Sequence, residues 1–224
     1  MRVIIAGAGR AGVSVAVHLR KGGHDVVVID RDAEMTRRAF EEFGLVSLHG
    51  DASEPSMLQA ADVSITDVVV TLLRRDADNL AVALLARHAG AKRVMVRMRD
   101  TAYREVYAAA GVSRIVSEID IFVGALATAI EHESVRHSMI LGRGESVAFE
   151  LSVPVNTWIA GSTISEIDEH PEFPTSCVFA GLVEESGVVH APRGSSVVTG
   201  GMTVVLVARK DELAQVIAFF MRTK

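Results

Sequence analysis

The stretch VIIAGAGRAG at residues 3–12 places three glycines between a short apolar run and a segment with helical periodicity. A Gly-x-Gly-x-x-Gly turn between a strand and a helix brings the free N–H groups of the helix N-terminus close to a bound phosphate. We expect Gly7 to allow the tight turn, Gly9 to let the backbone approach the phosphate, and Gly12 to let the helix pack closely on the strand. The stretch therefore predicts a strand, a turn and a helix that together bind a nucleotide.

A second apolar run, at residues 26–29, ends in Asp30. A carboxylate in this place after the glycine turn accepts hydrogen bonds from the two hydroxyls of a ribose. We therefore expect an adenine nucleotide or dinucleotide with an unmodified ribose. Arg31 would tolerate a 2′-phosphate, but Asp30 would repel it. The alternative is that the glycines form only a tight strand–helix turn and that Asp30 caps the next helix.

Strand-like and helix-like segments alternate from residue 1 to about 117. This alternation predicts a doubly wound parallel sheet, Rossmann-like in class, with a ligand crevice at the carboxyl ends of its strands. Runs such as residues 68–70 are apolar on both faces, as a sheet covered on both sides requires. The expected strands are 2–6, 25–30, 45–49, 67–72, 93–97 and 113–116, and the expected helices are 10–22, 33–43, 54–61, 77–89 and 101–110.

The texture of the sequence changes after a long apolar-faced helix expected at residues 118–135. Four of the five prolines lie after residue 150, and short strand-like runs replace the alternation. These runs are 147–153, 177–183, 188–190 and 203–207, followed by a helix at about 211–221. We expect a nucleotide-binding domain at residues 1–138, with the long helix as its connector, and a smaller α+β regulatory domain at residues 139–224.

Composition narrows the classes of function. The 224 residues are 49% hydrophobic and 23% charged, which is typical of a globular protein, and the net charge of −5 argues against nucleic acid as the main partner. No apolar run approaches the roughly 18 residues of a membrane span, and the first strand starts too early to leave room for a signal peptide. These features predict a cytoplasmic protein.

Four more polar residues are expected at the carboxyl edge of the sheet. Asp51 accepts a hydrogen bond from an adenine amino group, or it only closes a turn. Asn79 bonds a neighbouring loop, or it caps a helix. The planar fork of Arg97 suits a phosphate or a carboxylate such as Glu118. Arg10 lies near any phosphate at the glycine turn, or it is simply exposed.

Motifs for catalysis are missing from the sequence. There is no nucleophile elbow, no HExxH zinc motif, and no lysine–histidine pair placed to move protons in a hydride transfer. The single cysteine, Cys177, excludes an intrachain disulfide and a cysteine metal cluster. We expect it to be a small buried hydrophobe. The sequence therefore favours a protein that is not an enzyme and holds no metal.

The motifs, taken in order, resemble the Trk/Ktr regulators of potassium transport, with an RCK (or KTN) N-terminal domain and an RCK C-terminal domain. The first part of the resemblance rests on GAGRAG at 7–12, Asp30, GDA at 50–52, DADN at 76–79 and VMVR at 94–97. The second part rests on Val153 and Pro154, AGSTISEI at 160–167, GVVHAPRG at 187–194 and GGM at 200–202. The resemblance covers practically the whole chain. It departs at LLRR, residues 72–75, where the family commonly has a threonine and acidic residues, so this rim is more basic here.

The resemblance implies a regulatory subunit that gates a separate membrane potassium channel or transporter from the inner face of the cell membrane. It also implies dimers assembled into a ring, often an octamer, and ATP/ADP or NAD(H) as ligand. Some relatives bind cyclic di-AMP in the C-terminal domain, but no residue set here establishes that. Arg10 and Arg97 are our candidates for sensing the terminal phosphate. The predicted ligand-binding residues are Gly7, Ala8, Gly9, Arg10, Ala11, Gly12, Asp30, Arg31, Asp51, Ala52, Thr71, Leu72, Leu73, Asn79 and Arg97.

Two other functions fit the same motifs. A small NAD-dependent oxidoreductase would use the glycine turn and Asp30 in the same way, although the proton-transfer residues are missing. A nucleotide sensor without a membrane partner is the other alternative.

Overall fold

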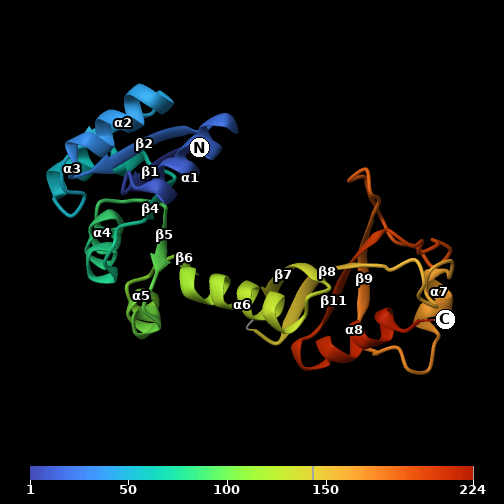
Figure 1. The fold of residues 1–224 in the computed structure, drawn as a ribbon. Coiled ribbons are helices and arrows are strands. Elements are labelled where there is room, and N and C mark those ends of the chain that lie inside the picture. Colours follow the sequence, from blue (N-terminus) through green and yellow to red (C-terminus); the bar gives the residue numbers. More distant parts are fainter. Residues whose placement is uncertain (143, 224) are drawn as a thin grey trace. The chain divides into compact units, whose positions relative to one another are not determined.

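The computed structural model describes residues 1–142 and 144–223 (Figure 1). By its internal contacts the chain divides into two units, Met1–Ile119 and Asp120–Lys224. The domain boundary that we placed near residue 138 stays a prediction; that residue lies in strand β7 (Val135–Leu141).

The first unit is built on a six-stranded sheet in the order β3-β2-β1-β4-β5-β6, with every neighbouring pair parallel. The strand order reverses between β1 and β4, and both of these parallel strands end at the carboxyl edge of the sheet. In a doubly wound sheet this is where ligands bind. The strands are β1 (Arg2–Ala6), β2 (Asp25–Asp30), β3 (Val46–His49), β4 (Val68–Thr71), β5 (Arg93–Met98) and β6 (Arg114–Ser117).

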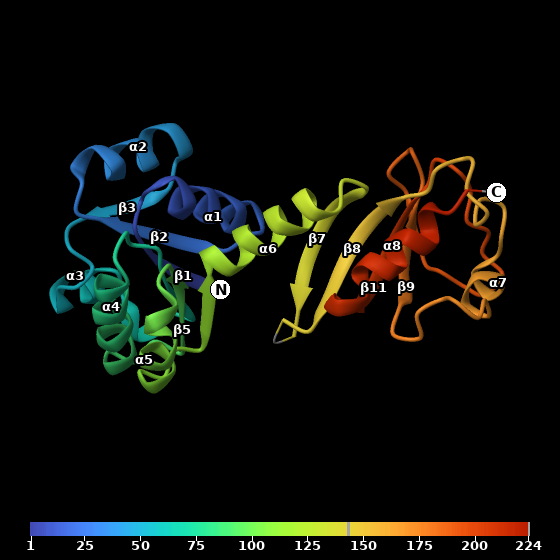
Figure 2. The same cartoon turned by 60° about the horizontal axis from the view of Figure 1, so that its bottom comes forward.

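Helices cover both faces of this sheet, with α1 and α2 on one side and α3, α4 and α5 on the other (Figure 2). Successive residues of β1 alternate between two cores, because side chains along a strand point to opposite faces. Val3 and Ile5 pack on the side of α1 and α2, whereas Ile4 and Ala6 pack on the side of α4. The helices are α1 (Arg10–Lys21), α2 (Ala33–Phe43), α3 (Pro55–Ala60), α4 (Asp76–His88) and α5 (Arg104–Ala109), with short 3-10 turns at Val63–Ile65 and Thr101–Tyr103.

The second unit contains an antiparallel five-stranded sheet in the order β10-β9-β11-β8-β7. Alternate residues of β8 face the core, and helix α8 covers them with Leu213, Val216, Phe219 and Phe220. The remaining elements are α6 (Glu118–Glu131), β8 (Ser146–Ser152), α7 (Ile164–Asp168), β9 (Val178–Val183), β10 (Val189–His190), β11 (Thr203–Arg209), the 3-10 turn Lys210–Glu212 and α8 (Leu213–Met221).

The predicted fold class, a Rossmann-like sheet followed by a smaller α+β unit, is confirmed. The helix predicted at residues 118–135 is too long, since α6 ends at Glu131 and Val135 already belongs to β7. We did not predict β7 because Arg136 and His137 interrupt its apolar pattern. It is an edge strand whose register shifts between Val135 and Ser138. Only its buried residue, Val135, joins the core.

Cys177 is buried in the core of the second unit, as predicted, with 2% of its surface exposed. Burial, together with the charges of Glu212 and Asp168, raises the pKa of its thiol to about 12. A thiol with this pKa is protonated at neutral pH and therefore a poor nucleophile. Across residues 1–142 and 144–223, no helix has the length and apolar character that a bilayer crossing requires.

Candidate functional site

The glycine turn joins the carboxyl end of β1 to the start of α1. Gly7 has a φ of +113°, a conformation that favours glycine, and its N–H donates to the carbonyl of Ile29 at 2.7 Å. A Cβ on Gly12 would lie 1.8 Å from the Gly7 carbonyl oxygen, so the helix packs on the turn as closely as a glycine allows. Around Gly9, by contrast, nothing lies within 4 Å of an added Cβ. The conformational roles predicted for Gly7 and Gly12 are confirmed.

The start of α1 lacks a side-chain cap. Its N-cap residue is Gly9, which has no side chain to accept a hydrogen bond from the first-turn N–H groups. The first turn also contains no acidic residue. Arg10 and Ala11 are exposed here. The helix N-terminus, with its partial positive charge, is thus available to an anion.

Asp30, at the end of β2, ties the glycine turn to the second strand. Its Oδ2 accepts a hydrogen bond from the Ala8 N–H at 2.6 Å, and its Oδ1 accepts one from the Asp32 N–H at 2.9 Å. A carboxylate offers about four acceptor positions, so capacity for further donors remains. The alternative that Asp30 caps the next helix is wrong, because Asp32 caps α2 by accepting from Glu34 and Met35.

Asp51 lies just after β3 in a turn of its own. Its Oδ1 accepts from both the backbone N–H and the hydroxyl of Ser53, at 2.8 and 2.7 Å. The hydroxyl bond is the main reason why the pKa of Asp51 lies below its ordinary value, and the charge of Arg31 adds to it. The turn-closing alternative is therefore realised in the structure. A contact with an adenine stays a prediction.

The segment after β4 contacts the glycine turn directly. The Leu72 N–H donates to the Ala6 carbonyl at 2.8 Å, and the Leu72 carbonyl oxygen lies 3.1 Å from where a Gly7 Cβ would be. Asn79, fully buried in α4, holds this segment from behind. Its Oδ1 accepts from the Leu73 N–H at 2.8 Å, while its Nδ2 donates to the carbonyls of Leu73 and Arg97 at 3.2 and 3.3 Å. Of our two alternatives for Asn79, bonding to a neighbouring loop is confirmed.

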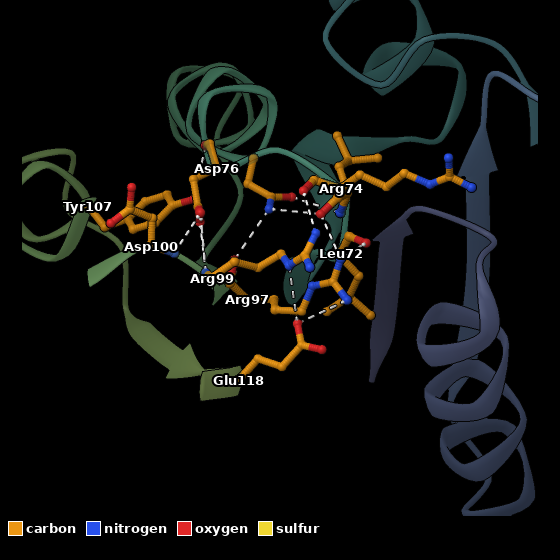
Figure 3. A network of polar contacts seen from close by, with 10 residues as sticks. Leu72, Arg74, Asp76, Arg97, Arg99, Asp100, Tyr107 and Glu118 are labelled. Carbon is orange, nitrogen blue, oxygen red and sulfur yellow. Dashed lines mark hydrogen bonds and ion pairs between the residues drawn. The ribbon is translucent and has the colours of Figure 1, made fainter. Parts of the chain in front are cut away.

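Arg97, at the end of β5, also turns toward this segment (Figure 3). Its Nη2 donates to the carbonyls of Leu72 and Leu73 at 3.1 and 2.8 Å, and its Nη1 lies 3.4 Å from Glu118 Oε2. The side chain is only 19% exposed. The carboxylate partner that we considered for Arg97 is thus present, and its contact with a phosphate stays a prediction.

The comparisons with known proteins place this site in a family. The model of the TrkA-N domain matches residues 3–118, slightly more than half of the chain. The chain belongs to the TrkA-N domain family. The matched range contains the glycine turn and ends at Glu118, the residue that pairs with Arg97.

Curated relatives align with nearly the whole chain. It is 29% identical to a Trk system potassium uptake protein TrkA homolog of Archaeoglobus fulgidus, covering 98% of this chain and 50% of that protein. It is 22% identical to a TrkA homolog of Methanothermobacter thermautotrophicus, covering 96% and 97%. It is 28% identical to the TrkA of Azorhizobium caulinodans, covering 98% and 47%. The chain therefore spans about half of the first and third relatives and nearly all of the second.

Solved structures show the same fold. The crystal structure of the GsuK RCK domain aligns with all of this chain, with a TM-score of 0.66 at 19% identity. The alignment includes 48% of the GsuK chain. The GsuK channel covers all of this chain and 40% of its own, with a TM-score of 0.71 at 20% identity. A GsuK channel bound to NAD reaches 0.67 over the same shares at 20% identity. The expected resemblance to this family is confirmed.

Within the TrkA-N domain, the structure reveals a hub that we did not predict, the carboxylate of Asp76. This residue begins α4 and is 7% exposed. It accepts hydrogen bonds from the backbone N–H groups of Arg99 and Asp100, at 3.2 and 3.0 Å, and from the Tyr107 hydroxyl at 2.9 Å. Burial is the main cause that raises the pKa of Tyr107. An acidic first turn after a strand was the available signal, but its partners lie 23 to 31 residues away.

Arg99 is the second residue of the TrkA-N domain that sequence reasoning missed. Its Nη1 donates to the Arg74 carbonyl at 3.2 Å and its Nε lies 3.7 Å from Glu118 Oε2. Three side chains, those of Asn79, Arg97 and Arg99, thus hold the carbonyls of residues 72–74. Figure 3 shows the two arginines of this set.

The predicted residues divide by exposure. Ala8, Ala52, Thr71 and Asn79 are buried, so their side chains face the core of the TrkA-N domain. The Thr71 hydroxyl and Arg97 Nε are buried atoms for which the described residues provide no hydrogen-bond partner. Across residues 1–142 and 144–223, no group of three or more histidine, cysteine or acidic side chains is placed to hold a metal ion.

Replacement by alanine should have very different effects on stability at Gly12 and at Gly9. Gly12→Ala should lower the free energy of unfolding by about 3 kcal/mol, because the new methyl group overlaps a backbone oxygen. Gly9→Ala should change it by less than about 1 kcal/mol, since the space is open and the backbone is extended. Urea unfolding followed by circular dichroism measures both. Equal losses in the two variants would contradict this account of the turn.

Proposed function

We propose that this chain is a nucleotide-binding regulatory subunit of potassium uptake, which as a homo-oligomer gates a separate membrane channel or transporter. The observation that carries the proposal is the glycine turn with its uncapped helix start, open Gly9 and neighbouring Asp30. Membership of the TrkA-N family and the similarity to Trk system potassium uptake proteins support the potassium-uptake part.

The residues at this turn fit an adenine nucleotide. The open space over Gly9 admits a phosphate against the N-terminus of α1. The remaining acceptor capacity of Asp30 suits the hydroxyls of a ribose. ATP, ADP and NAD(H) share both groups, and GsuK has been solved bound to NAD and bound to ADP. We therefore propose ATP/ADP or NAD(H) as the ligand.

A path for the signal runs from the turn to the start of α6. Leu72 contacts Gly7, Arg97 holds the Leu72 and Leu73 carbonyls, and Glu118 pairs with Arg97 as the first residue of α6. A ligand shifts a gate only if it binds two states unequally. A nucleotide that displaces residues 72–73 in one state would transmit that difference through Arg97 to Glu118.

Helix α6 supports the homo-oligomer. None of its residues is buried, although it is strongly apolar. The side chains of Ile121, Phe122 and Ile130 are exposed by 64%, 61% and 74%. Exposed apolar side chains concentrated on one helix are typical of a protein–protein interface. We propose that α6 packs against a second copy of the chain, in a dimer that assembles further into a ring.

The rival function is a small NAD-dependent oxidoreductase, which the glycine turn and Asp30 would serve equally well. The proton-transfer residues of such an enzyme are not recognisable in the sequence. Substrate-dependent turnover of NADH by the purified chain would favour this rival over a regulatory subunit.

If the site binds an adenine nucleotide, that nucleotide should stabilise the folded chain. ATP, ADP or NAD(H) should raise the melting temperature, because a ligand that binds only the folded chain stabilises it. Gly9→Ala should abolish most of this shift while folding as well as the parent, since its methyl group occupies the space of the phosphate. Thermal-shift measurements with ATP, ADP, NAD, NADH and cyclic di-AMP make the test. If no adenine nucleotide shifts the parent chain, the assignment is wrong.

The regulatory role predicts a membrane partner. A tagged chain, extracted gently in detergent from its own host, should co-purify with a pore-forming protein. Host cells that lack the chain should take up potassium more slowly, and the parent chain, but not the destabilised Gly12→Ala variant, should restore uptake. Normal uptake without the chain would support the alternative of a sensor that has no membrane partner.

The oligomer predicts an effect of charge on α6. Phe122→Glu should weaken self-association at least about tenfold, because a carboxylate would be buried in an apolar interface. Glu131→Gln, an exposed change at the end of the same helix, is the control and should leave association unchanged. Light scattering across a concentration series measures the mass. A parent chain that stays monomeric would refute the α6 interface.

A further inference from the structure

Residues 72–75 follow the carboxyl end of β4 and contain two arginines, Arg74 and Arg75. This end lies next to β1, at the reversal of the strand order and against the glycine turn. Both arginines are exposed. The segment therefore brings cationic side chains to the end of the sheet where we propose the phosphates.

Side chains hold the carbonyls of this segment, while the Leu72 N–H donates to the Ala6 carbonyl. Arg97 and Asn79 bind the carbonyl of Leu73, and Arg99 binds the carbonyl of Arg74. The guanidinium groups of Arg97 and Arg99 are also paired with Glu118. Glu118 thus offsets part of the charge of these two arginines, and both of them position the segment.

The side chain of Arg74 behaves differently. It extends away from the network, toward the ribbon of β1 and β2 (Figure 3). Within the described part of the chain, no hydrogen bond or ion pair is recorded for its guanidinium, whereas Arg75 lies 4.0 Å from Asp78. Arg74 is thus the cation of this segment with its fork free for a ligand.

The strand order puts acidic residues on one side of β1 and Arg74 on the other. Asp51 follows β3 and Asp30 ends β2, on one side of β1, whereas Arg74 follows β4 on the other side. Carboxylates suit the hydroxyls and amino group of a nucleoside, and a guanidinium fork suits phosphate oxygens. A nucleotide with its sugar at Asp30 and its first phosphates at the glycine turn would direct its phosphate tail toward Arg74.

We propose that Arg74 binds the terminal phosphate of a nucleoside di- or triphosphate and so makes the site selective for ADP and ATP over NAD. This inference rests on the proposed function, since it presupposes a nucleotide at the glycine turn. Each phosphate of NAD has one ester bond and one anhydride bond to its neighbour, and it carries a single negative charge. A terminal phosphate carries a charge of about −1.5 to −2 near pH 7 and offers three acceptor oxygens to the fork of Arg74.

The test compares Arg74→Gln with the matched control Arg75→Gln, using titration calorimetry with ATP, ADP, AMP and NAD. Arg74→Gln should raise the dissociation constants of ATP and ADP about tenfold, and those of AMP and NAD by less than about threefold. Arg75→Gln should leave all four within about twofold of the parent chain. Circular dichroism checks that both variants fold.

The outcomes separate this inference from the proposed function. If the parent chain binds ATP or ADP and Arg74→Gln binds them equally well, the role of Arg74 is refuted while the nucleotide site stands. If Arg74→Gln weakens all four ligands equally, Arg74 supports the site without selecting the terminal phosphate, and the selectivity is refuted. If the parent chain binds none of the four, the proposed function fails and the inference fails with it.

Discussion

The close approach of α1 to the end of β1 is the constraint on which the rest of the site depends. Gly12 sits so near the Gly7 carbonyl that any side chain would overlap it, and Gly7 turns the chain with a φ that favours glycine. This geometry leaves Gly9 open and directs the Ala8 N–H to Asp30. One backbone contact thus sets the helix N-terminus, the open space beside it and the orientation of the Asp30 carboxylate.

A second set of contacts beside the glycine turn pairs the backbone groups of residues 72–74. Backbone N–H and carbonyl groups leaving β4 would be costly to bury unpaired. Asn79, Arg97 and Arg99 supply partners for residues 72–74, while Asp76 does the same for the segment after β5. Glu118 joins Arg97 and Arg99 at the first residue of α6. The contacts of Arg97 and Arg99 therefore connect residues 72–74 to the first residue of α6, the helix that we propose as an oligomer contact.

Apolar surface is handled differently in the two units. The parallel sheet of Met1–Ile119 buries both faces under helices, so β1 and β2 are almost continuously apolar. The antiparallel sheet of Asp120–Lys224 alternates instead, with Val147, Phe149 and Leu151 facing its core. Helix α6 follows neither rule, because its apolar side chains remain exposed in the single chain. That exception is the physical reason to look for a second copy.

Local chemistry made much of this chain readable from its sequence. Neighbouring residues alone set the glycine spacing and the alternation of strands and helices. The structure confirms the turn, the parallel sheet and the position of Asp30 at the end of β2. Strand β7 was not readable, because Arg136 and His137 hide the pattern of an edge strand. Only the tertiary structure decided between our alternatives by pairing Arg97 with Glu118, and only it showed that Asp76 binds the backbone after β5. Within residues 1–142 and 144–223, it also leaves the Arg74 guanidinium without an ion-pair or hydrogen-bond partner. These pairings join residues about 20 or more positions apart, and only the order of the strands in the sheet brings them together.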